Sequence, residues 1–155
     1  MHKEEAEDAP NVLTGTFSIL TQPVDVLFDS GATHSFIFVK LVESLGLAST
    51  NKFSLLSLIL PNGKTVMYED LYKDCPLRMY EYEFMADLYG FDQTDFGVIL
   101  GMDWLAKHQA QVDRPTRKIT LKGLNGEKVV HMGQRPRMGV KLISMMQVHR
   151  SLGQG

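Results

Sequence analysis

Residues 26–32 read Val-Leu-Phe-Asp-Ser-Gly-Ala, an apolar run that ends in a carboxylate and three small residues. Residues 24–28 predict a short strand, because apolar and β-branched side chains dominate them. A strand that runs directly into a small-residue loop can hold the side chain of Asp29 at a fixed place. Gly31 lets the backbone approach closely, since it has no Cβ. The stretch therefore indicates either a catalytic loop or a plain turn in which Asp29 caps the local backbone.

Peptide hydrolysis would give such a carboxylate a defined task. One carboxylate has to be ionised to take a proton from water, and another has to be protonated to polarise the carbonyl group. Two aspartates held about 3 Å apart cannot both ionise, so they share a proton and titrate as a unit. The Ser30 hydroxyl can bond across to a partner loop and fix both carboxylates.

A second distinctive stretch, residues 98–105, reads Val-Ile-Leu-Gly-Met-Asp-Trp-Leu. By composition, residues 96–100 predict a buried strand that ends at Gly101. Residues 102–108 predict a short helix with Trp104 facing inward.

Together the two stretches resemble the retropepsin-like aspartic proteases of gypsy-type LTR retrotransposons, especially those of plants. Typical members carry Asp-Ser-Gly-Ala-Thr-His-Ser-Phe-Ile and Ile-Leu-Gly-Met-Asp-Trp-Leu, which stand here at residues 29–37 and 99–105. Residues 74–76 and 95–96 also resemble positions of that family. The resemblance covers residues 11–132.

The resemblance implies a mainly β, retropepsin-like acid-protease fold. Such a domain is closed and barrel-like, has a flap hairpin and one or two short helices, and is active as a homodimer. Asp29 would be the catalytic residue, contributed once by each subunit. Ser30, Gly31 and Ala32 would complete the active-site loop, and Ser30 would make a hydrogen bond across the dimer.

The resemblance also implies a flap and a support for the active-site loop. Leu100 and Gly101 would pack beneath the loop. The flap that closes over substrate and excludes water would have its tip at Pro61, Asn62, Gly63 and Lys64. The chain departs from many retroviral members, because its flap tip has one glycine, Met-Asp follows Gly101 where they have Arg-Asn, and their terminal dimer strands are not recognisable here.

The rest of the chain predicts short strands, hairpins and one more helix. Residues 12–20 favour a strand, residues 90–95 a loop and residues 114–116 a turn. A helix is expected from the spacing of Phe38, Leu41, Val42 and Leu45, with Gly46 as its C-terminal cap. Hairpins are expected for residues 53–60 with 65–72 about Asn62-Gly63, for the strands about Tyr80-Glu81, and for residues 118–121 with 127–131 about Asn125-Gly126.

Length and composition predict one globular domain. The chain has 155 residues, of which 44% are hydrophobic and 22% charged, which excludes collagen-like, coiled-coil and fully disordered classes. We expect a polar lead-in at residues 1–10, the protease domain at 11–132 and a flexible linker or tail at 133–155. Cys75 is the single cysteine, so no intramolecular disulfide can form, which fits a reducing compartment.

Charge and hydropathy bear on partners and location. The formal net charge of -2 gives no global field for nucleic acid, although the end of the chain after Glu127 is basic. No apolar run reaches the length of a membrane span, and the start has no signal-peptide core. We therefore expect a soluble, cytoplasmic protein, with virus-like particles as one setting, and no membrane partner.

Other candidate sites are weaker. Asp103 lacks a following Ser/Thr-Gly and stands at an expected helix start, so we assign it a capping role and not that of a second catalytic aspartate. His34 and Ser35 follow Asp29 closely, but a Ser-His-Asp triad needs converging side chains and not sequence neighbours. The histidines and Cys75 lack metal-ligand spacing and no phosphate loop is present, so we expect neither a metal nor a cofactor.

The leading hypothesis is an aspartic endopeptidase that acts on polypeptides, its own Gag-Pol polyprotein above all, as a homodimer. The alternative is a catalytically silent retropepsin fold that serves as a dimerisation or peptide-binding module. A third, weaker idea is nucleic-acid binding by the basic residues of 133–155.

Overall fold

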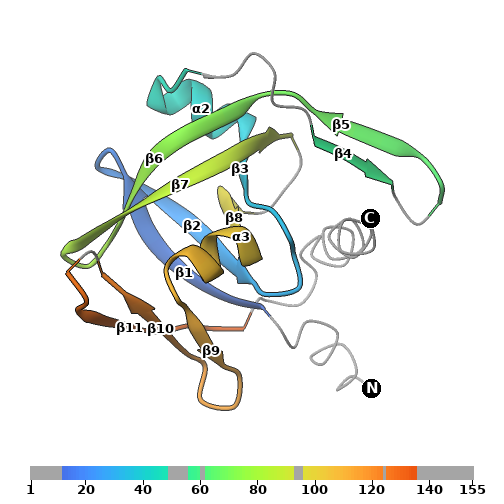
Figure 1. Ribbon diagram of the computed structural model, residues 1–155. Coiled ribbons are helices and arrows are strands. Elements are labelled where there is room, and N and C mark those ends of the chain that lie inside the picture. The colour runs from blue at the N-terminus through green and yellow to red at the C-terminus, as the bar shows by residue number, and fades with distance from the viewer. Residues whose placement is uncertain (1–11, 49–55, 60–61, 93–95, 124, 136–155) are drawn as a thin grey trace.

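The fold is a closed β-barrel that carries a three-stranded sheet and a projecting hairpin (Figure 1). A computed structural model describes residues 12–48, 56–59, 62–92, 96–123 and 125–135. The barrel strands follow the order β1-β2-β8-β3-β7-β6. This arrangement confirms the prediction of a mainly β, closed, barrel-like domain with short helices.

The strands and helices have the following bounds. The barrel consists of β1 (Val12–Ile19), β2 (Gln22–Asp29), β3 (Phe36–Phe38), β6 (Leu71–Met79), β7 (Tyr82–Phe91) and β8 (Val98–Leu100). The projecting hairpin consists of β4 (Leu56–Ile59) and β5 (Thr65–Tyr68). The three-stranded sheet consists of β9 (Gln111–Asp113), β10 (Lys118–Lys122) and β11 (Lys128–Met132). The helices are α2 (Val39–Leu45) and α3 (Met102–Lys107).

Strand β8 is the centre of the barrel wall that carries the candidate site. It pairs in parallel with β2 and antiparallel with β3. All three of its residues are buried, which explains its continuous apolar sequence. Because Phe28 stands opposite Leu100 in this parallel pair, Asp29, the last residue of β2, and Gly101, which follows β8, lie side by side.

Two apolar clusters hold the fold together. The larger one fills the barrel and includes Phe17, Phe28, Phe84 and Trp104, with the Phe84 and Trp104 rings 5.8 Å apart and edge to face. Side chains of β10 and β11 also belong to it, so the three-stranded sheet covers this part of the barrel. Burying each large apolar side chain contributes about 1.5–3 kcal/mol.

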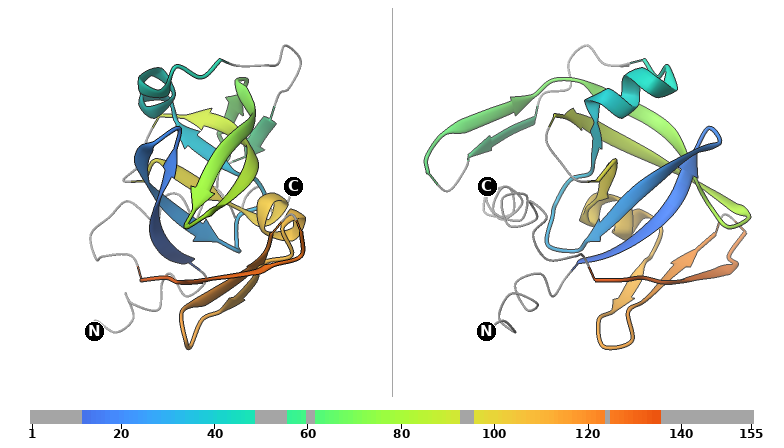
Figure 2. Two further views of the ribbon diagram at one scale, coloured as in Figure 1. Left: turned by 90° about the vertical axis from the view of Figure 1, so that its left-hand side faces the viewer. Right: turned by 180° about the vertical axis from the view of Figure 1, so that it is seen from behind.

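The smaller cluster joins the base of the β4–β5 hairpin to the barrel. Its buried members are Val12, Leu27, Phe36, Phe91 and Ile99, and Tyr68 of β5 packs against it. The Phe36 and Tyr68 ring centroids lie 5.3 Å apart. The hairpin is therefore anchored at its base, while its outer end extends beyond the barrel (Figure 2).

Two strand predictions were wrong. We expected a loop over residues 90–95, but β7 continues to Phe91, where Ile37 and Phe38 of β3 stand opposite Gly90 and Phe91. Gly90 is there for close packing, because a Cβ would lie 3.2 Å from Val39 Cγ1 and 3.3 Å from Tyr72 Cε2. The expected single strand over 65–72 is two, because β5 ends at Tyr68 and β6 begins at Leu71.

Smaller differences concern strand β9, the helix start and the turns. Strand β9 was not expected, and the helix begins at Val39, one residue after Phe38. Gly46 caps this helix in the left-handed region with φ +72, as predicted. In the Asn62-Gly63 and Asn125-Gly126 turns, the glycine has a positive φ, +90 for Gly63 and +85 for Gly126, whereas the asparagine before it does not.

Hydrogen-bonded structure continues beyond β11. Thr14 N–H donates to the Gln134 carbonyl at 2.8 Å, and Gln134 N–H donates to the Thr14 carbonyl at 3.2 Å. Gly133 N–H donates to the Arg117 carbonyl at 2.7 Å. Gly133 and Gln134 lie in the range 133–155, which we expected to be a flexible linker or tail. Among the helices of the described residues, none has the length and hydropathy that a membrane crossing needs.

Candidate active site

Asp29 is the last residue of β2 and is fully buried. The Gly31 N–H donates to Asp29 Oδ1 at 2.9 Å, and the Ala32 N–H donates to the Asp29 carbonyl at 3.1 Å. A buried carboxylate is costly unless it accepts hydrogen bonds, so the Gly31 amide both stabilises and orients it. The residues Asp29, Ser30, Gly31 and Ala32 thus form one tight loop with a fixed carboxylate.

The loop rests on the first turn of α3. The Met102 N–H donates to the Ala32 carbonyl at 2.7 Å, and the Asp103 N–H donates to the Thr33 carbonyl at 3.2 Å. A Cβ at Gly101 would lie 2.8 Å from the Ala32 carbonyl oxygen and closer still to that of His34. Only a glycine therefore allows this approach. Gly101 lies against the loop, and Leu100 before it stands opposite Phe28 of β2.

A serine hydroxyl adds a further link between the loop and α3. Ser35 is fully buried; its Oγ accepts the Gly101 N–H at 2.9 Å and donates to Asp103 Oδ1 at 2.6 Å. The same Asp103 oxygen accepts the Trp104 N–H at 2.7 Å. Asp103 lies in the first turn of α3, where we expected a helix start, but the N-terminal cap residue is Gly101 and not Asp103. From the sequence we considered Ser35 only as a triad member and missed its contacts with Gly101 and Asp103; the available signal was a lone hydroxyl just before the apolar residues Phe36 and Ile37.

His34 and Ser35 do not form a catalytic triad with Asp29. His34 Nδ1 lies 2.9 Å from Thr33 Oγ1, and its ring lies edge-on to Tyr89 at 6.1 Å. The Ser35 hydroxyl is directed to Asp103 instead. Within the described residues, no three or more His, Cys, Asp and Glu side chains are grouped in a way that could hold a metal ion.

The expected flap tip lies at the end of the β4–β5 hairpin. Lys64 N–H donates to Asn62 Oδ1 at 2.9 Å, and both residues are exposed, as is Gly63. Pro61 lies outside the described residues. The tip stands away from the barrel and from the Asp29 loop (Figure 2), so the structure brings the loop and its support together and sets the flap tip apart.

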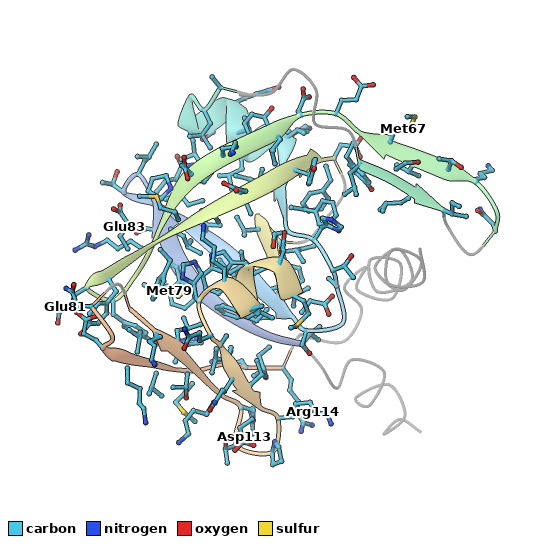
Figure 3. The ribbon with its side chains drawn as sticks, in the orientation of Figure 1. Met67, Met79, Glu81, Glu83, Asp113 and Arg114 are labelled. Carbon is cyan, nitrogen blue, oxygen red and sulfur yellow. The ribbon has the colours of Figure 1, made fainter. Side chains whose placement is uncertain are left out.

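A groove begins at Ser30 of the Asp29 loop and runs between α3 and β9. Its volume is about 240 Å³. Met102 on its wall is 42% exposed although it is apolar. Arg114, which follows β9, stands at the end of that strand (Figure 3). The groove is lined by Ser30, Met102, Leu105, Ala110, Val112 and Arg114.

Comparison with known proteins agrees with this geometry. A family described as retroviral aspartyl protease matches residues 1–127. Among solved structures, the retroviral protease-like domain of Ddi1 from Leishmania major is similar, with a TM-score of 0.58 and 15% identity over 83% of this chain and 97% of that chain. At this identity the likeness concerns the fold alone, and no curated protein sequence matches the chain significantly. Because the family match spans most of the chain, including the Asp29 loop and the Gly101 turn, the chain belongs to the retroviral aspartyl protease family.

Proposed function

We propose that the protein is an aspartic endopeptidase whose active site forms when two copies each contribute Asp29. The observation that carries the proposal is the buried Asp29 carboxylate, oriented by the Gly31 N–H at 2.9 Å on a loop that is tied to α3. This is a preorganised carboxylate on a rigid support, which hydrolysis by a carboxylate pair needs.

The reaction proceeds by direct attack of water. The ionised carboxylate of the pair takes a proton as the water oxygen attacks the scissile carbonyl carbon, and the protonated carboxyl donates to the carbonyl oxygen. A tetrahedral diol forms with no covalent bond to the enzyme. The protonated carboxyl then donates its proton to the amide nitrogen, while the other carboxylate takes a proton from a hydroxyl of the diol. The C–N bond breaks to release an amine and a carboxylic acid, and the pair is again singly protonated. In each copy the Gly31 amide keeps its carboxylate oriented through these steps.

A second copy supplies the second carboxylate. In the whole sequence, Asp-Ser-Gly occurs only at residues 29–31. Asp103 is a poor substitute, because its Oδ1 already accepts hydrogen bonds from Ser35 and Trp104. The groove beside Ser30, with its exposed Met102, gives the same face of a second molecule a surface to meet in a twofold pair.

The substrate is a polypeptide. The resemblance of residues 29–37 and 99–105 to retrotransposon proteases supports a Gag-Pol polyprotein as the natural substrate. The β4–β5 hairpin would close over it as a flap.

Cleavage of a denatured protein from about pH 4 to pH 7 tests the proposal, with the wild type compared with Asp29→Asn. We expect cleavage by the wild type, fastest at mildly acidic pH, and none by Asp29→Asn. Asp25→Asn is a matched control, because this aspartate lies in the same strand, is exposed and bonds to Thr16 Oγ1 at 3.0 Å. It should cleave like the wild type. Equal cleavage by Asp29→Asn would reject the assigned site.

A silent dimerisation or peptide-binding module is the second candidate. The observation that favours it is the 0% exposure of Asp29 in the single chain, because water has to reach a catalytic carboxylate. A wild type that forms dimers and binds peptides but does not cleave across the same pH range would establish this candidate.

A further inference from the structure

We propose that Ser35 and Asp103 are positioning residues, which set the rate of hydrolysis by holding the Asp29 loop against α3. The inference rests on the proposed endopeptidase activity. Neither side chain is assigned a contact with substrate. The link runs from the Gly101 N–H to Ser35 Oγ at 2.9 Å, and from the Ser35 hydroxyl to Asp103 Oδ1 at 2.6 Å.

Ser35 closes the second end of the active-site loop. The loop leaves β2 at Asp29 and enters β3 at Phe36, and both strands pair with β8. Ser35 is the last residue before β3, and its hydroxyl bonds to the residue that follows β8, Gly101. Both ends of the loop are therefore fixed to the same short strand and the turn behind it.

Three consecutive residues of the α3 turn hold three residues of the loop. Gly101 bonds to Ser35 through the hydroxyl, Met102 to the Ala32 carbonyl and Asp103 to the Thr33 carbonyl. Ala32 in turn bonds to the Asp29 carbonyl at 3.1 Å. A shift of the α3 turn is thus transmitted to the Asp29 backbone through two hydrogen bonds.

The Ser35–Asp103 bond goes beyond contacts within the helix itself. Inside the first turn of α3, Asp103 Oδ1 accepts the Trp104 N–H at 2.7 Å, and that contact does not need Ser35. The 2.6 Å bond from Ser35 is short, as expected for a hydroxyl that donates to a carboxylate. The Ser35 hydroxyl is fully buried and takes part in two hydrogen bonds: its oxygen accepts the Gly101 N–H, and its O–H donates to Asp103. Removing the Ser35 hydroxyl leaves the Gly101 N–H without this acceptor, and removing the Asp103 carboxylate leaves the Ser35 hydroxyl without this acceptor.

Kinetics of three variants test the proposal. Ser35→Ala and Asp103→Ala should lower kcat by about 10- to 100-fold, because a displaced catalytic carboxylate loses rate steeply, while KM changes by less than about twofold. Asp103→Asn keeps an Oδ1 acceptor for both donors, so its kcat should stay within about threefold of the wild type. The double variant Ser35→Ala/Asp103→Ala should be no slower than either single variant, since the two side chains act as one unit.

A stability control separates positioning from a loss of folding. Ile119→Val removes a methyl group from a fully buried side chain in β10, away from the loop. Its midpoint of urea unfolding should fall while kcat stays at the wild-type value. If Ile119→Val lowered kcat as much as Ser35→Ala did at a similar midpoint, or if Ser35→Ala kept wild-type kcat, the proposal would be overturned.

Amide hydrogen exchange reads the loop geometry without any cleavage. The amides of Gly31, Ala32 and Gly101 donate to Asp29 Oδ1, the Asp29 carbonyl and Ser35 Oγ. In Ser35→Ala all three should exchange faster by about tenfold or more, whereas Asp103→Asn should leave them near the wild-type rates. If exchange is faster in Ser35→Ala but the wild type does not cleave, the proposed endopeptidase activity is rejected and the role of Ser35 in holding the loop is supported. Unchanged exchange together with an active wild type would reject only the positioning role.

Discussion

Gly101 shows how a single residue without a Cβ shapes the candidate site. Its α-carbon lies against the backbone carbonyls of Ala32 and His34, and it is the N-terminal cap residue of α3. Backbone atoms cannot rotate out of the way as the end of a flexible side chain can. The closeness of the loop to the helix therefore depends on this one position.

Gly101→Ala should destabilise the protein by about 3 kcal/mol or more, because the new Cβ overlaps two carbonyl groups. Gly126→Ala is a suitable comparison, since it has φ +85 and nothing within 4 Å of an added Cβ. That variant should lose only about 1 kcal/mol through backbone strain. Urea unfolding with linear extrapolation measures both, and similar losses would show that the Gly101 contact is not strained.

At the scale of elements, one histidine joins strands that lie far apart in the sequence. His131 of β11 is buried, and its ring packs against Phe17 of β1 at 4.8 Å. Its Nε2 lies 3.2 Å from the Thr14 carbonyl and its Nδ1 lies 2.7 Å from the Tyr80 hydroxyl. A neutral ring that donates from Nε2 and accepts at Nδ1 satisfies both partners. The three-stranded sheet is thus attached to the barrel through an uncharged imidazole.

Stability should therefore decrease in acid. Burial lowers the pKa of His131, and the hydrogen bond to Thr14 offsets only part of this effect. The unfolded chain takes up a proton near the ordinary histidine pKa of about 6.5, so the stabilisation is complete above that pH and is lost as pH falls through the lower folded pKa. The urea midpoint should fall between pH 7.5 and pH 5 by more in the wild type than in His131→Gln.

His108 has to be separated from His131 in that measurement. Burial also lowers the pKa of His108, which packs against Trp104 and Phe84, so it contributes with the same sign. Comparing the pH dependence of the urea midpoint in His131→Gln with that in His108→Gln shows how much each histidine contributes to the loss of stability in acid. If the urea midpoint depended on pH equally in the wild type and in His131→Gln, protonation of the His131 ring would not be a cause of the loss of stability in acid.

The sequence was sufficient for those elements whose signal is local. The Tyr80-Glu81 turn, the Gly46 cap and the helix after Gly101 were all predicted from their own residues. The pairing of β2 with β8 and of β3 with β7 was not, because it joins segments far apart and depends on tertiary packing. Strand β9 has three residues and only one neighbour, β10, so no periodicity could identify it.

In the candidate site, too, some features could be predicted from local sequence and others depend on tertiary contacts. The loop at residues 29–32 and the glycine that supports it were recognisable as patterns, and the structure places them in contact. The catalytic role of Asp29 stays a prediction. The contact of Ser35 with Asp103 was missed because a hydrogen bond between two side chains 68 residues apart produces no periodic pattern in the sequence.

At the scale of the whole molecule, the groove beside Ser30 is the face that we expect to meet a second copy. Edge strand β9 runs along it, with Asp113 and Arg114 at the end of that strand (Figure 3). An exposed apolar side chain next to a loop that carries only one of the two proposed carboxylates is what a twofold interface would cover.

Met102→Glu should weaken dimerisation by about 100-fold or more, because it places a charge in the covered face. Met132→Glu is a matched control, since Met132 is 57% exposed on β11, outside the groove. Sedimentation equilibrium measures the dimer, and the activity of Met102→Glu should recover as its concentration rises. Dissociation caused by Met132→Glu instead would place the interface on the three-stranded sheet.

The mutual bonds of Thr14 and Gln134 have a mechanical consequence. The two residues pair antiparallel, so Val12, two residues before Thr14, and Arg135, one residue after Gln134, lie on the same side of the pair. Tension applied between Val12 and Arg135 would therefore break the Thr14–Gln134 hydrogen bonds one after the other, beginning from that side. Val12 stands opposite Asp29 in the pairing of β1 with β2, so the same tension would also act directly on the end of the strand that carries the Asp29 carboxylate.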